Sequence, residues 1–377
     1  MVTIIPISTK KELKQFTKFK LRLYRNNPFA ALPLYADERE ALLDGRNPAL
    51  KRYRHQVFLA KRDGKVVGRI VGIINHVSNR KEGTNYVRFG FVDFIEDFEV
   101  AEALVHAVEE WGRQYGMTAI HGPLGFTDFD PEGMLIEGFE EMSTIACFYN
   151  YPYYPEFFRR MGFEPVAEWA EYKIFVPDTL PEKYLRIADI VQQKYGLRIK
   201  RFRRISDIVR EGYGHQLFRL LNVTYAHLYG FTELTEEMIE YYIRKYVPLL
   251  RLELLTLIVN DRDELVCFGV ALPSLTRAMQ RARGRMFPLG FLYLLRALYS
   301  HHAKVCDLML VAARPDVQNI GAAALLFTDM IPQFQRLGTE YAESNPELVE
   351  NQRIHALWSN FDKVQHKRRV VFARNIQ

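Results

Sequence analysis

Residues 318–323 combine residue types that suit a phosphate-binding turn. The segment Gln318-Asn319-Ile320-Gly321-Ala322-Ala323 follows an apolar run and opens a long amphipathic stretch that ends at Gly338. Backbone N–H groups at the start of a helix attract anions, and small side chains let a ligand approach the backbone closely. An ordinary helix start rich in small residues fits the same pattern, so both interpretations stay open.

A second candidate site is an aromatic cluster between residues 148 and 158. Its tyrosines Tyr151, Tyr153 and Tyr154 have flat apolar faces and polar hydroxyl tips. Such residues line substrate pockets and also fill interfaces between domains. The cluster therefore predicts either an acceptor-binding pocket or inter-domain packing.

The elements that must position these residues occur twice along the 377-residue chain. Residues 57–75 and 254–272 each predict a β-hairpin around a polar turn. After each hairpin the pattern predicts an apolar strand, a long helix ending at a glycine, a further strand, another helix and a closing strand. The repeat predicts two similarly built units, residues 1–178 and 179–377, divided where two prolines bracket Asp178 and Thr179.

This order of elements resembles the GCN5-related N-acetyltransferase (GNAT) fold. The family's acyl-CoA loop reads Gln/Arg-x-x-Gly-x-Gly/Ala between a strand and a long helix, and residues 318–323 match it. The resemblance covers nearly the whole chain and extends to a little-characterised group of bacterial tandem proteins. It implies an α/β (α+β) fold of two GNAT-like units, each with a mixed, mostly antiparallel sheet flanked by helices. It also implies that acetyl-CoA or another acyl-CoA is the co-substrate, bound by Val311, Gln318, Asn319, Ile320, Gly321, Ala322 and Ala323.

The first unit departs from the family pattern at the equivalent turn, residues 95–100. This turn contains the acids Glu96, Asp97 and Glu99 and no glycine, so a pyrophosphate group would be repelled there. The resemblance thus implies one cofactor loop, in residues 179–377, and one degenerate copy, in residues 1–178.

The resemblance also implies a reaction, the transfer of an acetyl or other acyl group from acyl-CoA to a small-molecule or peptide amine. Many family members use a Tyr on the helix after the fifth strand as general acid, but Trp358 takes that place here. Tyr341, on the preceding strand, is a substitute. Glu343 is favoured over Glu340 as general base, because strand alternation puts Glu343 on the Tyr341 face.

Two other functions fit the same resemblance. Peptidoglycan-bridge aminoacyltransferases also pair two GNAT-like units, which indicates an aminoacyl-tRNA-dependent transferase as one alternative. The missing helix tyrosine and the acidic first turn fit a non-catalytic scaffold that binds CoA or a partner.

Composition and charge indicate which kinds of partner, nucleic acid, membrane or a second copy of the chain, are expected. The formal net charge is +6, and basic residues concentrate at 198–204, 277–285 and 363–374. No helix-turn-helix, zinc-finger or RNP pattern accompanies these runs, so nucleic acid is not expected as a partner. No apolar run reaches the roughly 18–20 residues that a membrane span needs. The nearest, 286–299, is expected to be a buried helix, and the alternatives are that it covers an acyl chain or meets a membrane surface. The sequence leaves a homodimer open.

Cysteine and histidine spacing bears on the compartment and on metals. Cys147, Cys267 and Cys306 lie far apart, which indicates no disulfide framework and a reducing, cytoplasmic compartment. His301 and His302 have no third ligand at metal spacing, so no metal site is expected.

Overall fold

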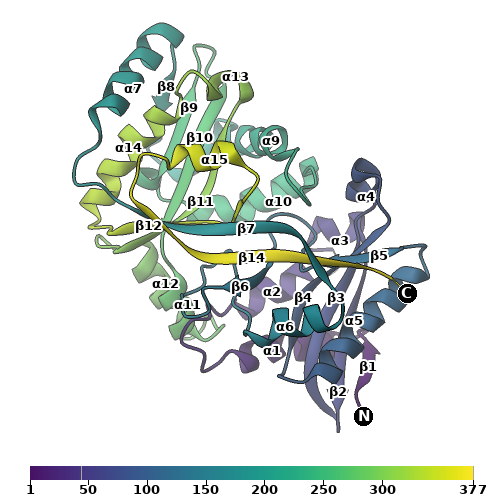
Figure 1. The fold of residues 1–377 in the computed structure, drawn as a ribbon. Helices are drawn as coiled ribbons and strands as arrows, with labels where there is room; N and C mark the ends of the chain where they lie inside the picture. Colours follow the sequence, from purple (N-terminus) through teal and green to yellow (C-terminus); the bar gives the residue numbers. More distant parts are fainter. Residues whose placement is uncertain (44, 377) are drawn as a thin grey trace.

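The chain folds into two successive α/β halves whose elements follow the predicted order (Figure 1). The computed structural model describes residues 1–43 and 45–376. The first half contains β1 (Thr3–Pro6), α1 (Lys10–Leu23), α2 (Tyr35–Ala41), α3 (Pro48–Arg52), β2 (Arg54–Arg62), β3 (Lys65–Ile74), α4 (His76–Glu82), β4 (Tyr86–Phe94), α5 (Phe98–Arg113), β5 (Ala119–Gly122), β6 (Met134–Glu137), α6 (Tyr153–Arg160) and β7 (Glu164–Phe175).

The second half repeats this order with additional helices. It contains α7 (Glu182–Tyr195), β8 (Arg198–Lys200), α8 (Ile205–Arg210), α9 (Tyr213–Tyr225), α10 (Glu236–Tyr246), β9 (Leu255–Val259), β10 (Leu265–Pro273), α11 (Thr276–Ala282), α12 (Gly290–Leu298), β11 (Val305–Ala313), α13 (Pro315–Gln318), α14 (Ala323–Arg336), β12 (Tyr341–Ser344), β13 (Glu347–Leu348), α15 (Gln352–Leu357) and β14 (Lys363–Asn375).

Corresponding strands and helices pack alike in the two halves. The hairpin β2–β3 turns at Asp63 and Gly64, both with positive φ, as the Asp-Gly pair predicts. Gly68 on β3 and Gly269 on β10 lie under the long helix of their own half. A Cβ at Gly68 would lie 2.7 Å from Leu104 Cδ1, and a Cβ at Gly269 would lie 3.0 Å from Met330 Sδ. Glycine at these two positions therefore lets α5 and α14 approach their sheets closely.

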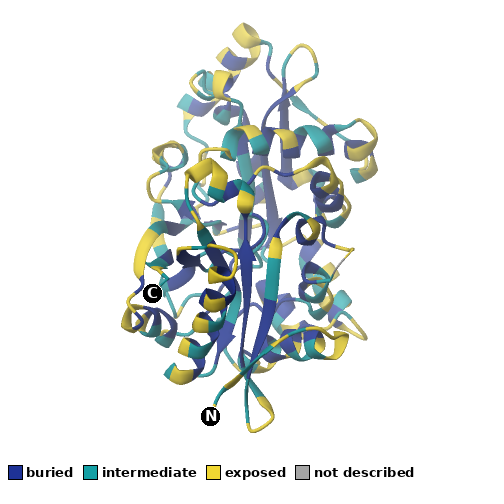
Figure 2. Cartoon of the chain, turned by 90° about the vertical axis from the view of Figure 1, so that its right-hand side faces the viewer, coloured by how far each residue is buried: buried dark blue, intermediate teal, exposed yellow. Residues whose placement is uncertain are grey.

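One continuous sheet joins the halves. Its strand order is β1-β2-β3-β4-β5-β14-β7-β12-β11-β10-β9-β8, with β6 paired to β14 and β13 paired to β7. Pairs β4–β5 and β11–β12 are parallel and the remaining pairs are antiparallel, which confirms the predicted mixed, mostly antiparallel fold. The central strands are buried along much of their length, while exposure concentrates on the helices and loops (Figure 2).

The closing strands of the two halves are exchanged. Strand β14, from the second half, lies between β5 and β7 of the first half, and β7 lies between β14 and β12 of the second half. Figure 1 shows the two long strands side by side across the middle of the molecule. The expected boundary at 178–179 falls in the linker between β7 and α7, but the sheet of each half is completed by a strand of the other.

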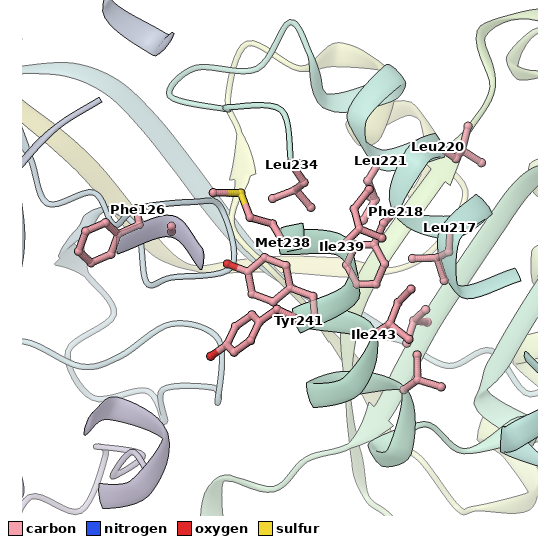
Figure 3. Packing of buried hydrophobic residues seen from close by; sticks show 14 of the residues in the cluster. Phe126, Leu217, Phe218, Leu220, Leu221, Leu234, Met238, Ile239, Tyr241 and Ile243 are labelled. Carbon is pink, nitrogen blue, oxygen red and sulfur yellow. The ribbon is translucent and has the colours of Figure 1, made fainter. Parts of the chain in front are cut away.

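A large apolar core lies between the halves. It unites first-half residues such as Phe16, Leu59 and Phe126 with side chains from α9, α10, β9 and β10 (Figure 3). Large aromatic and aliphatic side chains from both halves are removed from water together there, which stabilises the halves against each other.

The apolar stretch 286–299 is not the buried helix that its composition predicts. Within α12 only Gly290 and Leu298 are buried, and the apolar side chains Leu292 and Leu295 are exposed. The expectation of a buried helix was wrong because nearly all residues of α12 are apolar, so the composition does not show which side of the helix meets water.

Candidate active site

Strands β11 and β12 run parallel for a short distance and then part. Their paired residues extend from Val305 and Tyr341 to Leu308 and Ser344. Beyond this point β11 continues to Ala313, whereas the chain after Ser344 turns to β13, which pairs with β7. Among the described residues, the edge of β11 that faces away from β10 therefore has no strand partner beyond Leu308.

Side chains bond to this free edge in place of a strand. The Arg314 amide donates to the Val266 carbonyl, so the backbone groups of Arg314 point toward β10. Backbone groups alternate in direction along a strand, and those of Val311, three residues earlier, therefore point away from β10 and toward the opening. The Tyr225 hydroxyl donates to the Val311 carbonyl at 3.0 Å. Asn345 Nδ2 donates to the Met309 carbonyl at 2.7 Å, and Met309 is an extra residue in the β10–β11 register. Such β-bulges redirect the backbone, often beside functional sites.

The predicted phosphate loop lies at the end of β11, between α13 and α14. Gly321 has φ +88°, and a Cβ there would lie 2.6 Å from Ile187 Cγ2, so only glycine fits without strain. Among the described residues, no side chain caps the first turn of α14. The Gln318 side chain donates to the Ala313 carbonyl at 2.7 Å and accepts from Arg353 at 3.1 Å, which ties the loop to β11 and α15. The start of α14 is thus free of a side-chain cap among the described residues, while the amides of Ala324 and Leu325 donate to the carbonyls of Gly321 and Ala322 within the turn.

The equivalent place in the first half is closed. Asp97 caps α5 by accepting from the Val100 amide, and Arg62 pairs with both Asp97 and Glu99. Between β4 and β5 the chain itself fills the opening, since the Leu124 amide donates to the Phe89 carbonyl at 2.9 Å. The free strand edge and the uncapped helix therefore occur together in the second half and not in the first.

A carboxyl group and an imidazole face each other beside the opening. The Trp358 indole donates to Glu347 Oε1 at 2.8 Å, and His355 Nδ1 lies 3.3 Å from Glu347 Oε2. His355 Nε2 lies 3.1 Å from the Leu348 carbonyl, which can only accept, so Nε2 carries a hydrogen. Burial raises the pKa of Glu347 to about 7, although the bond from Trp358 opposes the shift. Neither Glu347 Oε2 nor His355 Nδ1 has a hydrogen-bond partner among the described residues.

Comparisons with known proteins bear on this arrangement. No protein-family model matches the chain. Protein YghO of Escherichia coli (strain K12) is 26% identical over 382 residues, covering 97% of this chain and 94% of that protein. Bacterial ceramide synthase of Caulobacter vibrioides (strain NA1000 / CB15N) is 26% identical over 325 residues, covering 84% of this chain and 82% of that protein.

Solved structures match along the whole chain. A tandem GNAT protein from the clavulanic acid biosynthesis pathway superposes with a TM-score of 0.55 at 12% identity, covering 100% of this chain and 99% of that one. The chain has the tandem GNAT fold. A probable N-acyltransferase from Enterococcus faecalis V583 superposes with a TM-score of 0.52 at 12% identity, covering 100% of this chain and 73% of that one.

Within the tandem GNAT fold, Tyr341 and Glu343 lie on β12, where the sequence places them. Glu343 is buried and its carboxylate is ion-paired with Lys367 of β14, with His366 Nε2 at 3.4 Å. Burial raises the pKa of Glu343, and Lys367 opposes the shift. Burial also raises the pKa of Tyr341. Glu343 is thus ion-paired with a lysine, whereas Glu347 Oε2 has no hydrogen-bond partner among the described residues and lies 3.3 Å from His355 Nδ1.

The three candidate substrate tyrosines pack inside the first half, away from the loop at 318–323. Tyr154 donates to the Phe94 carbonyl and accepts from the Phe94 amide, Tyr153 donates to the same carbonyl, and Tyr151 donates to the Leu23 carbonyl. Tyr151 also stacks on Tyr24, with ring centroids 5.1 Å apart. The structure groups these tyrosines with β4 and α1 and does not bring them to the β11–β12 opening.

Glu347, His355 and Tyr225 are not among the site residues that the sequence predicts. Glu347 and His355 are eight residues apart, on a two-residue strand and a short helix, and no motif spacing marks them. The signal that was available is Trp358, the residue that replaces the expected tyrosine and whose indole holds Glu347.

Neither a metal-binding cluster nor a membrane-crossing helix is found among the described residues. Within them, no group of three or more His, Cys, Asp or Glu side chains is arranged to hold a metal ion. None of the described helices combines the length and hydropathy that crossing a bilayer requires.

Proposed function

We propose that this protein is an acyl-CoA-dependent N-acyltransferase whose site is the β11–β12 opening of the second half. The observation that carries the proposal is the contrast between the halves: α5 is capped by Asp97, while α14 starts without a cap beside Gly321 and a free strand edge. An uncapped helix start suits the pyrophosphate of CoA, and the free edge of β11 suits the amides of its pantetheine arm. Val311, Gln318, Asn319, Ile320, Gly321, Ala322 and Ala323 are the proposed contacts.

Proton transfer in this reaction is assigned to the Glu347–His355 pair. Acyl-CoA supplies the thioester, from which the amine displaces the thiolate as the C–N bond forms and the C–S bond breaks, with one proton lost from nitrogen and one gained by sulfur. Glu347 is on the α15 side of the opening, where Trp358 replaces the expected tyrosine, so it is placed to return the proton to sulfur. Glu343 as general base toward the amine and Tyr341 as substitute general acid stay predictions.

A long-chain lipid amine is the acceptor class that we propose. Bacterial ceramide synthase is named for making an amide between a fatty acyl group and a long-chain amine, and its similarity extends over 84% of this chain. This similarity favours a fatty acyl-CoA over acetyl-CoA and a lipid amine over a peptide.

Thermal shift with acyl-CoA tests the binding step. Acetyl-CoA and palmitoyl-CoA should raise the melting temperature of the protein, and Asn319→Glu or Gly321→Glu should abolish the rise by placing an anion in the loop. Gly338→Glu is the matched control, because Gly338 ends the same helix region with φ +65° in open space, so it carries equal charge and similar backbone strain.

Mass spectrometry of products tests the reaction. The protein incubated with palmitoyl-CoA should acylate a long-chain amino alcohol and leave a peptide amine unmodified. Absence of any thermal shift with either thioester would overturn the cofactor assignment. A shift without product across lipid and peptide amines would instead support a non-catalytic scaffold.

A further inference from the structure

The α11–α12 insertion (residues 274–304) presents an exposed surface that is both apolar and positively charged. Exposed fractions are 75% for Phe287, 48% for Leu292 and 46% for Leu295, and Leu289 and Tyr299 are also exposed. Soluble surfaces rarely expose several large apolar side chains together unless the patch binds something.

The charge of the insertion is as unusual as its hydrophobicity. Residues 274–304 contain five arginines, one lysine and no acidic residue, so their formal charge of +6 equals the net charge of the whole chain. Arg277, Arg281, Arg283, Arg285 and Arg296 are exposed, and none forms an ion pair with a described residue. The other two basic runs are used internally: Arg198, Lys200 and Arg201 pair with acids, and so do Lys367, Arg368, Arg369 and Arg374.

The insertion is nevertheless firmly attached to both halves. Gln280 Nε2 donates to the Pro28 carbonyl, and the Tyr35 amide donates to the Gly284 carbonyl, both at 2.8 Å. At the end of α12, Arg251 donates to the carbonyls of Leu298 and Ser300. Its orientation is therefore set by the fold, with the apolar side chains held outward.

We propose that the α11–α12 insertion docks the protein on an anionic membrane surface. Apolar side chains such as Leu292 and Leu295 enter the headgroup region, and the unpaired arginines contact lipid phosphates. This combination of an apolar helix face and flanking arginines is what binding in the plane of the interface requires. A second copy of the chain fits less well, because a two-fold contact would bring one arginine-rich surface against another.

The insertion lies next to the proposed acyl-transfer site, so docking on a membrane would bring that site close to lipids. Leu294 on the inner side of α12 and Met309, the bulge residue of β11, pack against the same cluster of Leu272, Leu275 and Leu298. A helix lying on the membrane would thus border the acyl-transfer site, and a lipid amine would have a short path to it. This last step rests on the proposed function, whereas the docking itself does not.

Vesicle co-sedimentation without any acyl-CoA tests the docking separately from catalysis. The full-length protein should sediment with mixed phosphatidylcholine–phosphatidylglycerol vesicles and much less with phosphatidylcholine alone, and added salt should weaken binding. Leu292→Glu and Leu295→Glu should each lower the partition coefficient about tenfold. Arg281→Gln and Arg296→Gln should each lower it about fivefold.

Matched controls come from another exposed helix. Leu185→Glu and Ile190→Glu on α7 change side chains that are 49% and 48% exposed, and they should leave vesicle binding unchanged. All variants are checked by circular dichroism and thermal melting. Equal binding by the α12 and α7 variants, or no binding to anionic vesicles, would overturn the proposal. So would a dimer in solution that Leu292→Glu dissociates, since a second copy would then cover the patch.

Discussion

His355 Nδ1 lies 3.3 Å from Glu347 Oε2, and the other atoms of both side chains are fixed by Trp358 and by the Leu348 carbonyl. Neither of these two facing atoms has a hydrogen-bond partner among the described residues. The pair is the group to which we assign proton transfer in the proposed reaction.

Replacing Glu347 should therefore impair the chemical step more than binding. With Glu347→Gln, we expect kcat for amide formation to fall roughly 10²–10⁴-fold with little change in the thermal shift by acyl-CoA. In the unmodified protein, loss of the Glu347 proton should lower kcat as pH rises through about 7, and this limb should be absent in the variant. Glu350→Gln, an exposed neighbour, is the control. An unchanged pH profile in Glu347→Gln would remove Glu347 from the reaction.

Asp307 should make the protein less stable as pH rises. It is fully buried on β11 beside Glu343 of β12, and burial, with Glu343 adding to it, raises the pKa of Asp307 to about 7, while Ser274 and Lys367 oppose the shift. The folded state then binds a proton that the unfolded state releases near pH 4, so the free energy of unfolding falls between about pH 4 and pH 7.

Asp307→Asn should remove this dependence of the free energy of unfolding on pH. We expect the variant to gain on the order of 1–4 kcal/mol relative to the unmodified protein between about pH 4 and pH 8, measured by urea unfolding. Asp97→Asn is the contrast, because Arg62 lowers the pKa of Asp97 and no gain at high pH should follow. The prediction would be contradicted if the free energy of unfolding changed with pH in the same way in the unmodified protein and in Asp307→Asn.

Lys367 holds a buried charge network across the exchanged strands. Its ammonium contacts Glu171 on β7 at 2.9 Å and Glu343 on β12, and Arg369 donates to Glu171 at 2.6 Å. Lys367→Met leaves Glu343 without its cation, so we expect a loss of about 3–5 kcal/mol in the free energy of unfolding. Arg368→Met, one residue along and part-exposed, should cost about 0–1 kcal/mol. Equal losses in the free energy of unfolding from the two variants would contradict the prediction that the cost depends on burial of the charge network.

The strand exchange predicts that the halves do not fold separately. Residues 1–178 lack β14, the neighbour of both β5 and β7, and residues 179–377 lack β7 beside β12. Each fragment should aggregate or lack a cooperative melting transition when expressed alone, and co-expression should restore one. As a control, cleaving the folded protein between Asp178 and Thr179 should leave its melting temperature nearly unchanged. A stable isolated fragment would contradict this expectation.

Local signals in the sequence predicted the repeated elements well. The Asp63-Gly64 turn, the apolar strands and the glycines after the long helices are set by near neighbours in the chain, and the structure confirms them. The position of Gly321 between a strand and a helix was predicted for the same reason.

Long-range pairing was beyond what the sequence pattern could predict. Strands β7 and β14 both carry buried and exposed residues that suit either neighbour, so nothing local indicates that they change places. Glu347 and His355 meet only because β13 pairs with β7 and α15 folds back over it. The exposure of α12 was missed because its composition resembles a core helix.

The exchange of closing strands also determines when the edge of β5 is covered during synthesis of the chain. Residues 363–375 are synthesised after all the other strands of the sheet, yet they are the segment that covers the edge of β5 (Ala119–Gly122). The N–H and C=O groups of that edge therefore have no strand partner while the whole second half is being synthesised. Nascent chains that stall before residue 363 should therefore be the form of this protein most in need of a chaperone.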